Sequence, residues 1–194
     1  MQDPARNQFR LMHRLRVRWA EVDLQRIVFN PHYLMYIDTA LTDYWRAMAI
    51  PYEAIPTTLG GELYVKKSTL EYHGSARLDD LLDIGTRCAR IGNSSMVFEA
   101  GIFRDQQLLV SGELVYVFAD PETQTSRRVP DLLRGLMQSF EEGVSPVEIA
   151  LGNWNDLGAQ ASVLRRAVFN LEMGVGVDME QDPKDAQAVH VVVR

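Results

Sequence analysis

The segment from residue 30 to about residue 49 constrains the fold most, because it is predicted to be a helix with more apolar surface than a solvent-exposed helix carries. Asn30-Pro31 supplies an N-cap residue followed by proline, a pair that favours a helix start. The apolar stripe that follows consists of Tyr33, Leu34, Ile37, Ala40, Leu41, Tyr44, Trp45 and Met48. Other elements of the chain must therefore cover this helix.

Strand-length segments on both sides of the helix can supply that cover. Leu11–Trp19 alternates apolar with polar residues, which predicts a strand with one buried face. After a turn-rich stretch, further strands are predicted at 63–72, 81–91, 95–104 and 108–118. Short turns separate the last three, so these form an antiparallel meander. We expect an α+β fold in which an antiparallel sheet wraps around a long central helix.

The two ends of the chain have a different character. Residues 1–10 are polar and are expected to be a loose lead-in, and a short helix at 131–142 is expected to close a domain spanning 1–143. Residues 144–194 then form a helix-strand extension, with a helix at 156–171 and a terminal strand at 189–193. That strand needs a partner within the molecule, across an interface, or in further sequence.

Composition limits the function classes. The formal net charge of -6 gives no basic surface for nucleic acid, and no segment is long and apolar enough to span a membrane. The one cysteine, Cys88, cannot form an internal disulfide, and the N-terminus lacks the apolar stretch of a signal peptide. A cytoplasmic protein that partners neither nucleic acid nor membrane is expected.

The stretch from Arg18 to Tyr33 is the most informative about function. It places Asp23 directly after a predicted strand and seven residues before the helix start. A carboxylate there can lie near the unpaired amides of a helix N-terminus, which are suited to developing negative charge on an oxygen. This combination suits acyl transfer. The residues alone leave a second interpretation equally open, in which Asp23 only caps a turn.

Val17 to Tyr33 resembles the signature of the 4-hydroxybenzoyl-CoA thioesterase type of hotdog enzyme, and the strand order through residue 142 matches that family. The resemblance implies a hotdog fold, hydrolysis of an acyl-CoA without a cofactor beyond the CoA of the substrate, and a homodimer or homotetramer with the active site between protomers. It also implies Asp23 as nucleophile or general base, and the backbone N–H of Asn30 as donor to the thioester carbonyl.

The resemblance also suggests residues that contact the substrate. Ile27, Val28 and Tyr33 would line an acyl pocket. The turn that meets CoA phosphates in some relatives reads Gly-Asn-Ser-Ser here, so those contacts would fall to Arg90, Ser94 and Ser95.

The chain departs from the family pattern at two places. Gln25-Arg26 stands where relatives often have a glycine pair or Ala-Gly, and Asn30 stands where some carry a histidine. Without that histidine, Asp23 would act with water or as a nucleophile alone.

Other polar residues favour other interpretations. His32 follows the proline directly and residue 28 is Val28, so the spacing of the hydratase branch of the fold is not met. Asp38 on the predicted helix is an alternative nucleophile, although a surface role fits it better. His13 and His73 lie in predicted strands without neighbours at metal-ligand spacing, so no metal site is expected.

Two rival functions remain beside hydrolysis. One is a non-catalytic acyl-CoA binding module, and the other is a scaffold that dimerises an acetyltransferase. Residues 144–194 resemble the opening helix and strand of a GNAT acetyltransferase, but they lack its pyrophosphate-binding Gln/Arg-x-x-Gly-x-Gly/Ala loop. No acetyl transfer by this chain is expected.

Overall fold

The computed structural model describes residues 3–50, 52–176 and 182–193. They fall into two compact units, with the boundary between Pro146 and Val147. We call them the N-terminal unit and the C-terminal unit and consider each by itself.

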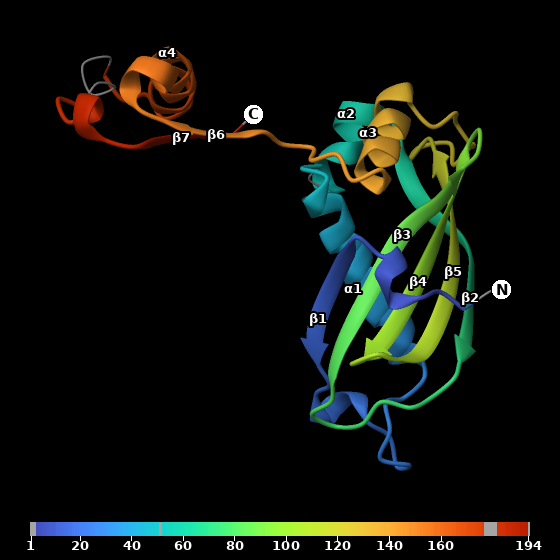
Figure 1. The fold of residues 1–194 in the computed structure, drawn as a ribbon. Helices are drawn as coiled ribbons and strands as arrows, with labels where there is room; N and C mark the ends of the chain where they lie inside the picture. The colour runs from blue at the N-terminus through green and yellow to red at the C-terminus, as the bar shows by residue number, and fades with distance from the viewer. Residues whose placement is uncertain (1–2, 51, 177–181, 194) are drawn as a thin grey trace. The chain divides into compact units, whose positions relative to one another are not determined.

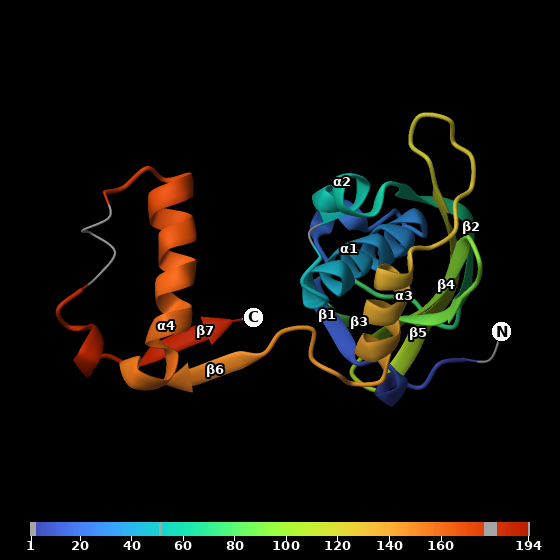
Figure 2. The ribbon, with the colours of Figure 1, turned by 90° about the horizontal axis from the view of Figure 1, so that it is seen from above.

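A five-stranded antiparallel sheet forms the N-terminal unit, in the order β1-β3-β4-β5-β2. The helix α1 (Pro31–Ala47) lies along one face of this sheet (Figures 1 and 2). This is the arrangement expected for a hotdog fold. The strands are β1 (Leu11–Arg16), β2 (Glu62–Tyr72), β3 (Leu81–Ile91), β4 (Ser95–Arg104) and β5 (Gln107–Ala119).

The core lies between α1 and the sheet. Tyr44 is fully buried, and its ring meets Phe98 of β4 edge-on with centroids 5.5 Å apart and Phe140 at 5.1 Å. The helix also buries Tyr33, Tyr36, Ile37, Ala40, Leu41 and Trp45. Leu34, predicted on the buried stripe, is 37% exposed, so that prediction was wrong. One sheet covers one side of the helix, and Leu34 lies at the margin of that side.

The start of the chain differs from the prediction in two respects. Trp19 was expected on the buried face of a strand, but β1 ends at Arg16 and Trp19 opens a 3-10 turn, where it is 79% exposed. The expectation of a loose lead-in was also wrong, since Pro4 and Phe9 are buried. We call residues 3–10 the N-terminal strap. It crosses the sheet face opposite α1 (Figure 1).

The remaining elements of this unit are short helices. α2 (Ile55–Leu59), preceded by a 3-10 turn at Tyr52–Ala54, lies in the stretch expected to be a loop. α3 (Asp131–Glu141) ends one residue before its predicted end.

Among the residues that the structure describes, the C-terminal unit contains one α-helix and one antiparallel pair of strands that are far apart in the sequence. β6 (Ile149–Gly152) pairs antiparallel with β7 (His190–Val193), so the terminal strand finds its partner within the chain. α4 (Trp154–Arg165) packs on them and continues into a π-helical stretch at Arg166–Glu172, and a 3-10 turn (η6, Asp185–Gln187) precedes β7. Across the described ranges of both units, no helix is long and apolar enough to cross a membrane.

Candidate active site

A closed loop carries Asp23 from β1 toward α1. Val22 and Val28 form an antiparallel bridge, and the Asp23 N–H donates to the Ile27 carbonyl at 2.9 Å. Arg26 closes the turn by donating its N–H to the Asp23 carbonyl at 2.9 Å, with φ at +62°. That left-handed conformation favours glycine. The loop therefore adopts at Arg26 a backbone conformation that glycine takes at no steric cost.

The Asp23 carboxylate has two distinct oxygens. Oδ1 accepts the Gln25 N–H at 2.7 Å, an Asx turn. Oδ2 accepts no hydrogen bond from the described part of the chain, and the side chain is half-buried. Asp23 thus caps a turn, as one of the two interpretations expects, and keeps one oxygen available for chemistry.

The first turn of α1 offers one uncommitted amide. Asn30 is the N-cap, its side chain makes no capping bond, and its N–H has no acceptor among the residues the structure describes. Pro31 has no N–H. The N–H groups of His32 and Tyr33 already bond the Phe29 and Asn30 carbonyls at 2.9 and 3.3 Å. Among the described residues at the start of α1, the Asn30 N–H is therefore a backbone donor without an acceptor.

The His32 side chain is half-buried. Its ring stacks on Tyr36 with centroids 6.5 Å apart and meets Phe29 edge-on. Its Nδ1 is buried without a hydrogen-bond partner. The side chain therefore belongs to the aromatic packing at the start of α1.

A hollow of about 350 Å³ lies between β1 and α1, beside this loop. Glu21 lies in it, only 3% exposed, and accepts bonds from the Arg18 N–H at 2.7 Å and the Tyr36 hydroxyl at 2.8 Å. Burial raises the pKa of Glu21, but the hydrogen bonds from Arg18 and Tyr36 outweigh burial and bring the pKa below its ordinary value. The lining residues are His13, Leu15, Arg16, Arg18, Glu21, Met35, Tyr36 and Thr39.

Sequence reasoning did not single out Glu21. The available signal was its position as a second acid two residues before Asp23. Glu21 is buried beside Tyr36, and the folded helix α1 is needed to bring these two residues together.

The residues predicted to line an acyl pocket are mostly in the core. Val28 and Tyr33 are each 2% exposed, and the Tyr33 hydroxyl accepts the Ala76 N–H at 2.9 Å. Burial of the Tyr33 hydroxyl raises its pKa. Ile27 is half-buried in the Asp23 loop. Of these three residues, Ile27 is the most exposed to solvent.

The predicted phosphate contacts lie far from Asp23 within one chain. The Val28 N–H bonds the Ala76 carbonyl at 2.9 Å, which ties the Asp23 loop to the segment before β3, whereas Ser94 and Ser95 follow the other end of β3. The 11 residues of β3 span roughly 35 Å. Arg90 is exposed near that far end. A single chain does not bring the two groups together.

Ser94 borders a second hollow, of about 550 Å³. Lys66 of β2 and Ser126 also line it. This hollow therefore combines a cationic group with hydroxyl groups.

Two other acids, the alternative nucleophile Asp38 and its neighbour on the helix Asp43, lie on α1. Asp38 is exposed, and Asp43 bonds His13 at 2.6 Å and Arg46 at 2.8 Å. Neither carboxylate lies in the Asp23 loop.

Comparison with known proteins gives a consistent result for the N-terminal unit. The family model described as Thioesterase superfamily matches residues 25–111, a segment that begins two residues after Asp23. "Acyl-CoA thioester hydrolase YbgC" of Escherichia coli is 29% identical over 117 residues, which is 60% of this chain and 87% of that protein.

Solved structures share the fold. A thioesterase superfamily protein from Jannaschia sp. CCS1 has a TM-score of 0.65 at 19% identity, covering 71% of this chain and 96% of its own. A thioesterase from Thermus thermophilus, solved with coenzyme A and Zn, has a TM-score of 0.61 at 21% identity, covering 70% and 96%.

Proposed function

Because residues 25–111 match the thioesterase superfamily on a hotdog fold, we propose that this chain hydrolyses an acyl-CoA thioester to a free carboxylic acid and CoA. The family match is the observation that carries the proposal. The E. coli relative, named as an acyl-CoA thioester hydrolase, supports the substrate class. Two features of the site support the chemistry, namely the uncommitted oxygen of Asp23 and the uncommitted N–H of Asn30.

In the proposed reaction, Asp23 is the base or the nucleophile. As a base, its carboxylate takes a proton from water while the water oxygen bonds the thioester carbon. The C–S bond then breaks, and the proton passes to the leaving thiolate of CoA. As a nucleophile, the carboxylate bonds the carbon itself, the C–S bond breaks, and CoA leaves as its thiolate. Water then cleaves the resulting mixed anhydride, which releases the acid, regenerates the Asp23 carboxylate and supplies the proton that the CoA thiolate takes up. Both routes need no cofactor.

The Asn30 N–H serves either route. Charge accumulates on the carbonyl oxygen when the tetrahedral intermediate forms, and a fixed amide at a helix N-terminus stabilises it. Asn30 therefore acts through its backbone, and its side chain contributes little.

A second copy of the chain is part of this proposal. Within one chain, Arg90, Ser94 and Ser95 lie at the opposite end of β3 from Asp23. One acyl-CoA can meet both groups only if another protomer supplies one of them. β1 and β2 are the two edges of the sheet and have outer sides open to pairing. A homodimer or homotetramer is therefore proposed.

Mixing two inactive variants tests the shared site. Asp23→Asn would remove the catalytic acid, and a combined Arg90→Ala, Ser94→Ala, Ser95→Ala variant would weaken CoA binding. A mixed dimer contains one site with both functions intact, so activity should partly return after mixing. No recovery, with dimers confirmed by light scattering, would contradict a shared site.

The proposed cytoplasmic location and the likeness of the C-terminal unit to an acetyltransferase both rest on features of the sequence. Cys88 is a free, half-buried thiol, in keeping with a reducing cytoplasm. Burial raises the pKa of this thiol to about 12, so it is unsuited to nucleophilic chemistry. The likeness of residues 144–194 to the opening of a GNAT acetyltransferase stays a prediction.

A thiol-release assay over a panel of aliphatic and aromatic acyl-CoAs tests the function. Hydrolysis should release CoA at a rate proportional to enzyme with at least one member of the panel. The rival function, a non-catalytic binding module, predicts acyl-CoA binding by calorimetry without thiol release. Binding without release across the panel would overturn the proposal.

A further inference from the structure

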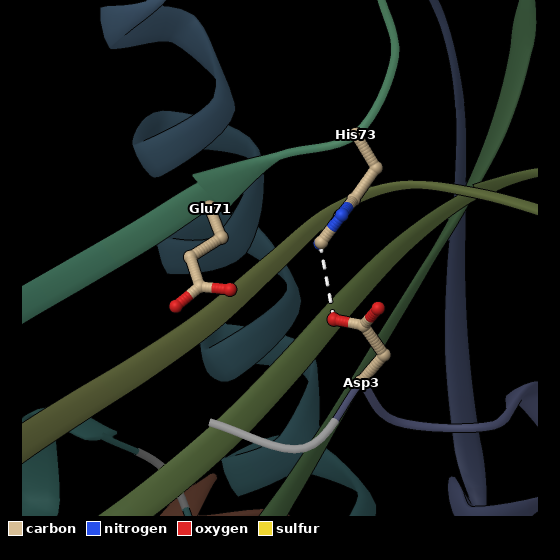
Figure 3. Close-up of side chains that lie close together, drawn as sticks. All are labelled: Asp3, Glu71 and His73. Carbon is tan, nitrogen blue, oxygen red and sulfur yellow. Dashed lines mark ion pairs between the residues drawn. The ribbon is translucent and has the colours of Figure 1, made fainter.

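Three side chains with metal-binding atoms meet beside the end of β2. His73 Nε2 lies 3.2 Å from Asp3 Oδ1 (Figure 3). The ligand atoms of Asp3, Glu71 and His73 all lie within 4.8 Å of one another. Among the described residues, no other group of three His, Cys, Asp or Glu side chains lies so close. The cluster is separate from the candidate active site, with which it shares no residue.

The sheet fixes two of these ligands. Glu71 and His73 are two residues apart, so their side chains leave the extended chain on the same side. Glu71 is paired with Ser111 of β5, and the His73 N–H bonds the Leu109 carbonyl at 2.8 Å. The backbone that carries both ligands is thus anchored to β5.

Ser111 of β5 contacts two of the three side chains in this cluster. Its hydroxyl is fully buried and lies 2.9 Å from His73 Nε2 and 3.4 Å from Asp3 Oδ1. If a metal ion bound His73 Nε2, the Ser111 hydroxyl would lose that partner and would donate its hydrogen bond to the Asp3 carboxylate. Groups that hydrogen-bond a ligand in this way orient it toward the metal.

The N-terminal strap delivers the third ligand. Phe9 fills the space over Gly85 and Gly101, where an added Cβ would lie 2.4 Å and 3.0 Å from its ring atoms. Arg6 pairs with the buried Asp83 at 2.7 Å. These contacts hold the N-terminal strap on the sheet and place Asp3 near β2. Binding of an ion therefore avoids the entropic cost of ordering this segment.

From this geometry we propose that Asp3, Glu71 and His73 bind one divalent transition-metal ion, with Zn²⁺ the best match, and that the ion fastens the N-terminal strap to β2. Two ligands bound to Zn²⁺ at about 2.1 Å in tetrahedral geometry lie about 3.4 Å apart. The separation of 3.2 Å between Asp3 and His73 fits that value. One imidazole nitrogen and two carboxylate oxygens suit Zn²⁺, and water would complete the coordination.

Calorimetric titration of the metal-free full chain with Zn²⁺ tests the site. One equivalent of Zn²⁺ should bind the wild type. The changes Asp3→Asn, Glu71→Gln and His73→Gln remove a ligand and keep the side-chain size. Each should weaken Zn²⁺ binding by roughly tenfold or more. All three side chains are surface-exposed, and circular dichroism should show the variants folded.

His13→Gln is the matched control. His13 also pairs with a carboxylate, Asp43 at 2.6 Å, but the described parts of the chain place no third ligand beside it. This variant should bind Zn²⁺ with unchanged affinity. Anomalous scattering from zinc in crystals should place the ion beside His73. Absence of Zn²⁺ binding by the wild type, or binding that survives His73→Gln, would overturn the proposal.

Discussion

Replacing Asn30 by proline deletes one backbone N–H and little else. The φ angle of Asn30 is -51°, within the range that the proline ring imposes. The N–H has no acceptor in the described structure, so its loss breaks no hydrogen bond of the fold. The residue is also exposed at the start of α1, so the loss of its side chain removes no buried contact. The stability of the protein should therefore change little.

The catalytic effect should be much larger. If the Asn30 N–H stabilises the oxyanion, its removal should lower kcat by roughly 10²- to 10³-fold, or about 3 to 4 kcal/mol of transition-state stabilisation. KM should change less, because the developing charge is greatest in the transition state. The contrast between a near-unchanged melting temperature and a large loss of kcat is the signature of an oxyanion donor.

The assay is steady-state thiol release with the best acyl-CoA of the panel, with Asn30→Ala as control. Alanine removes the side chain and retains the N–H, so kcat should stay close to that of the wild type. A folded Asn30→Pro protein with kcat within a few-fold of the wild type would refute the role of this amide. An equal loss in both variants would assign the effect to the side chain.

Two further predictions concern the N-terminal strap and Asp83, the carboxylate with which Arg6 of the strap pairs. Gly85→Ala places a Cβ against the Phe9 ring and should destabilise the fold by about 1–3 kcal/mol in urea melts. The same change in a Phe9→Ala background should cost less, and equal costs would contradict the packing account. For Asp83, hydrogen bonds from Arg14, against the effect of burial, and further bonds from Arg6 hold its pKa below the ordinary value. A depressed folded pKa contributes stability that is present above the unfolded pKa of about 3.9 and is lost as the pH falls through the folded pKa. Asp83→Asn should therefore destabilise the protein at pH 7 and progressively less in acid, and a deficit independent of pH would be inconsistent with this origin.

Local patterns were sufficient for much of the fold. The bounds of β3 and β4 agree with the predicted ranges, because each strand is a clear apolar run between turn residues. α1 starts where Asn30-Pro31 predicts. Its long apolar stripe also required a sheet to cover it, which is the arrangement found.

Features that depend on distant residues were not accessible in the same way. Phe9 looks like one apolar residue in a polar segment, and its role appears only once Gly85 and Gly101 lie side by side in the sheet. The cluster of Asp3, Glu71 and His73 has no recognisable spacing. Its one local signal was the i, i+2 placement of Glu71 and His73 on a predicted strand.

The candidate site was only partly predictable. The sequence alone allows Asp23 to be either a turn cap or a catalytic residue. In the structure, one carboxylate oxygen accepts the Gln25 N–H, and the other accepts no hydrogen bond from the described residues. The distance between Asp23 and the Ser94 turn within one chain follows from the length of β3, which no local pattern relates to the site.

Asp23→Asn tests the central claim most directly. An asparagine Oδ1 can still accept the Gln25 N–H, so the loop should remain closed while the base or nucleophile is lost. Asp182→Asn is the matched control, since Asp182 caps Lys184 in the same way at 2.9 Å in the C-terminal unit. For acyl-CoA hydrolysis, kcat/KM should fall by roughly 10²- to 10⁴-fold in Asp23→Asn and stay unchanged in Asp182→Asn. Wild-type turnover by a folded Asp23→Asn protein would show that Asp23 only caps its turn.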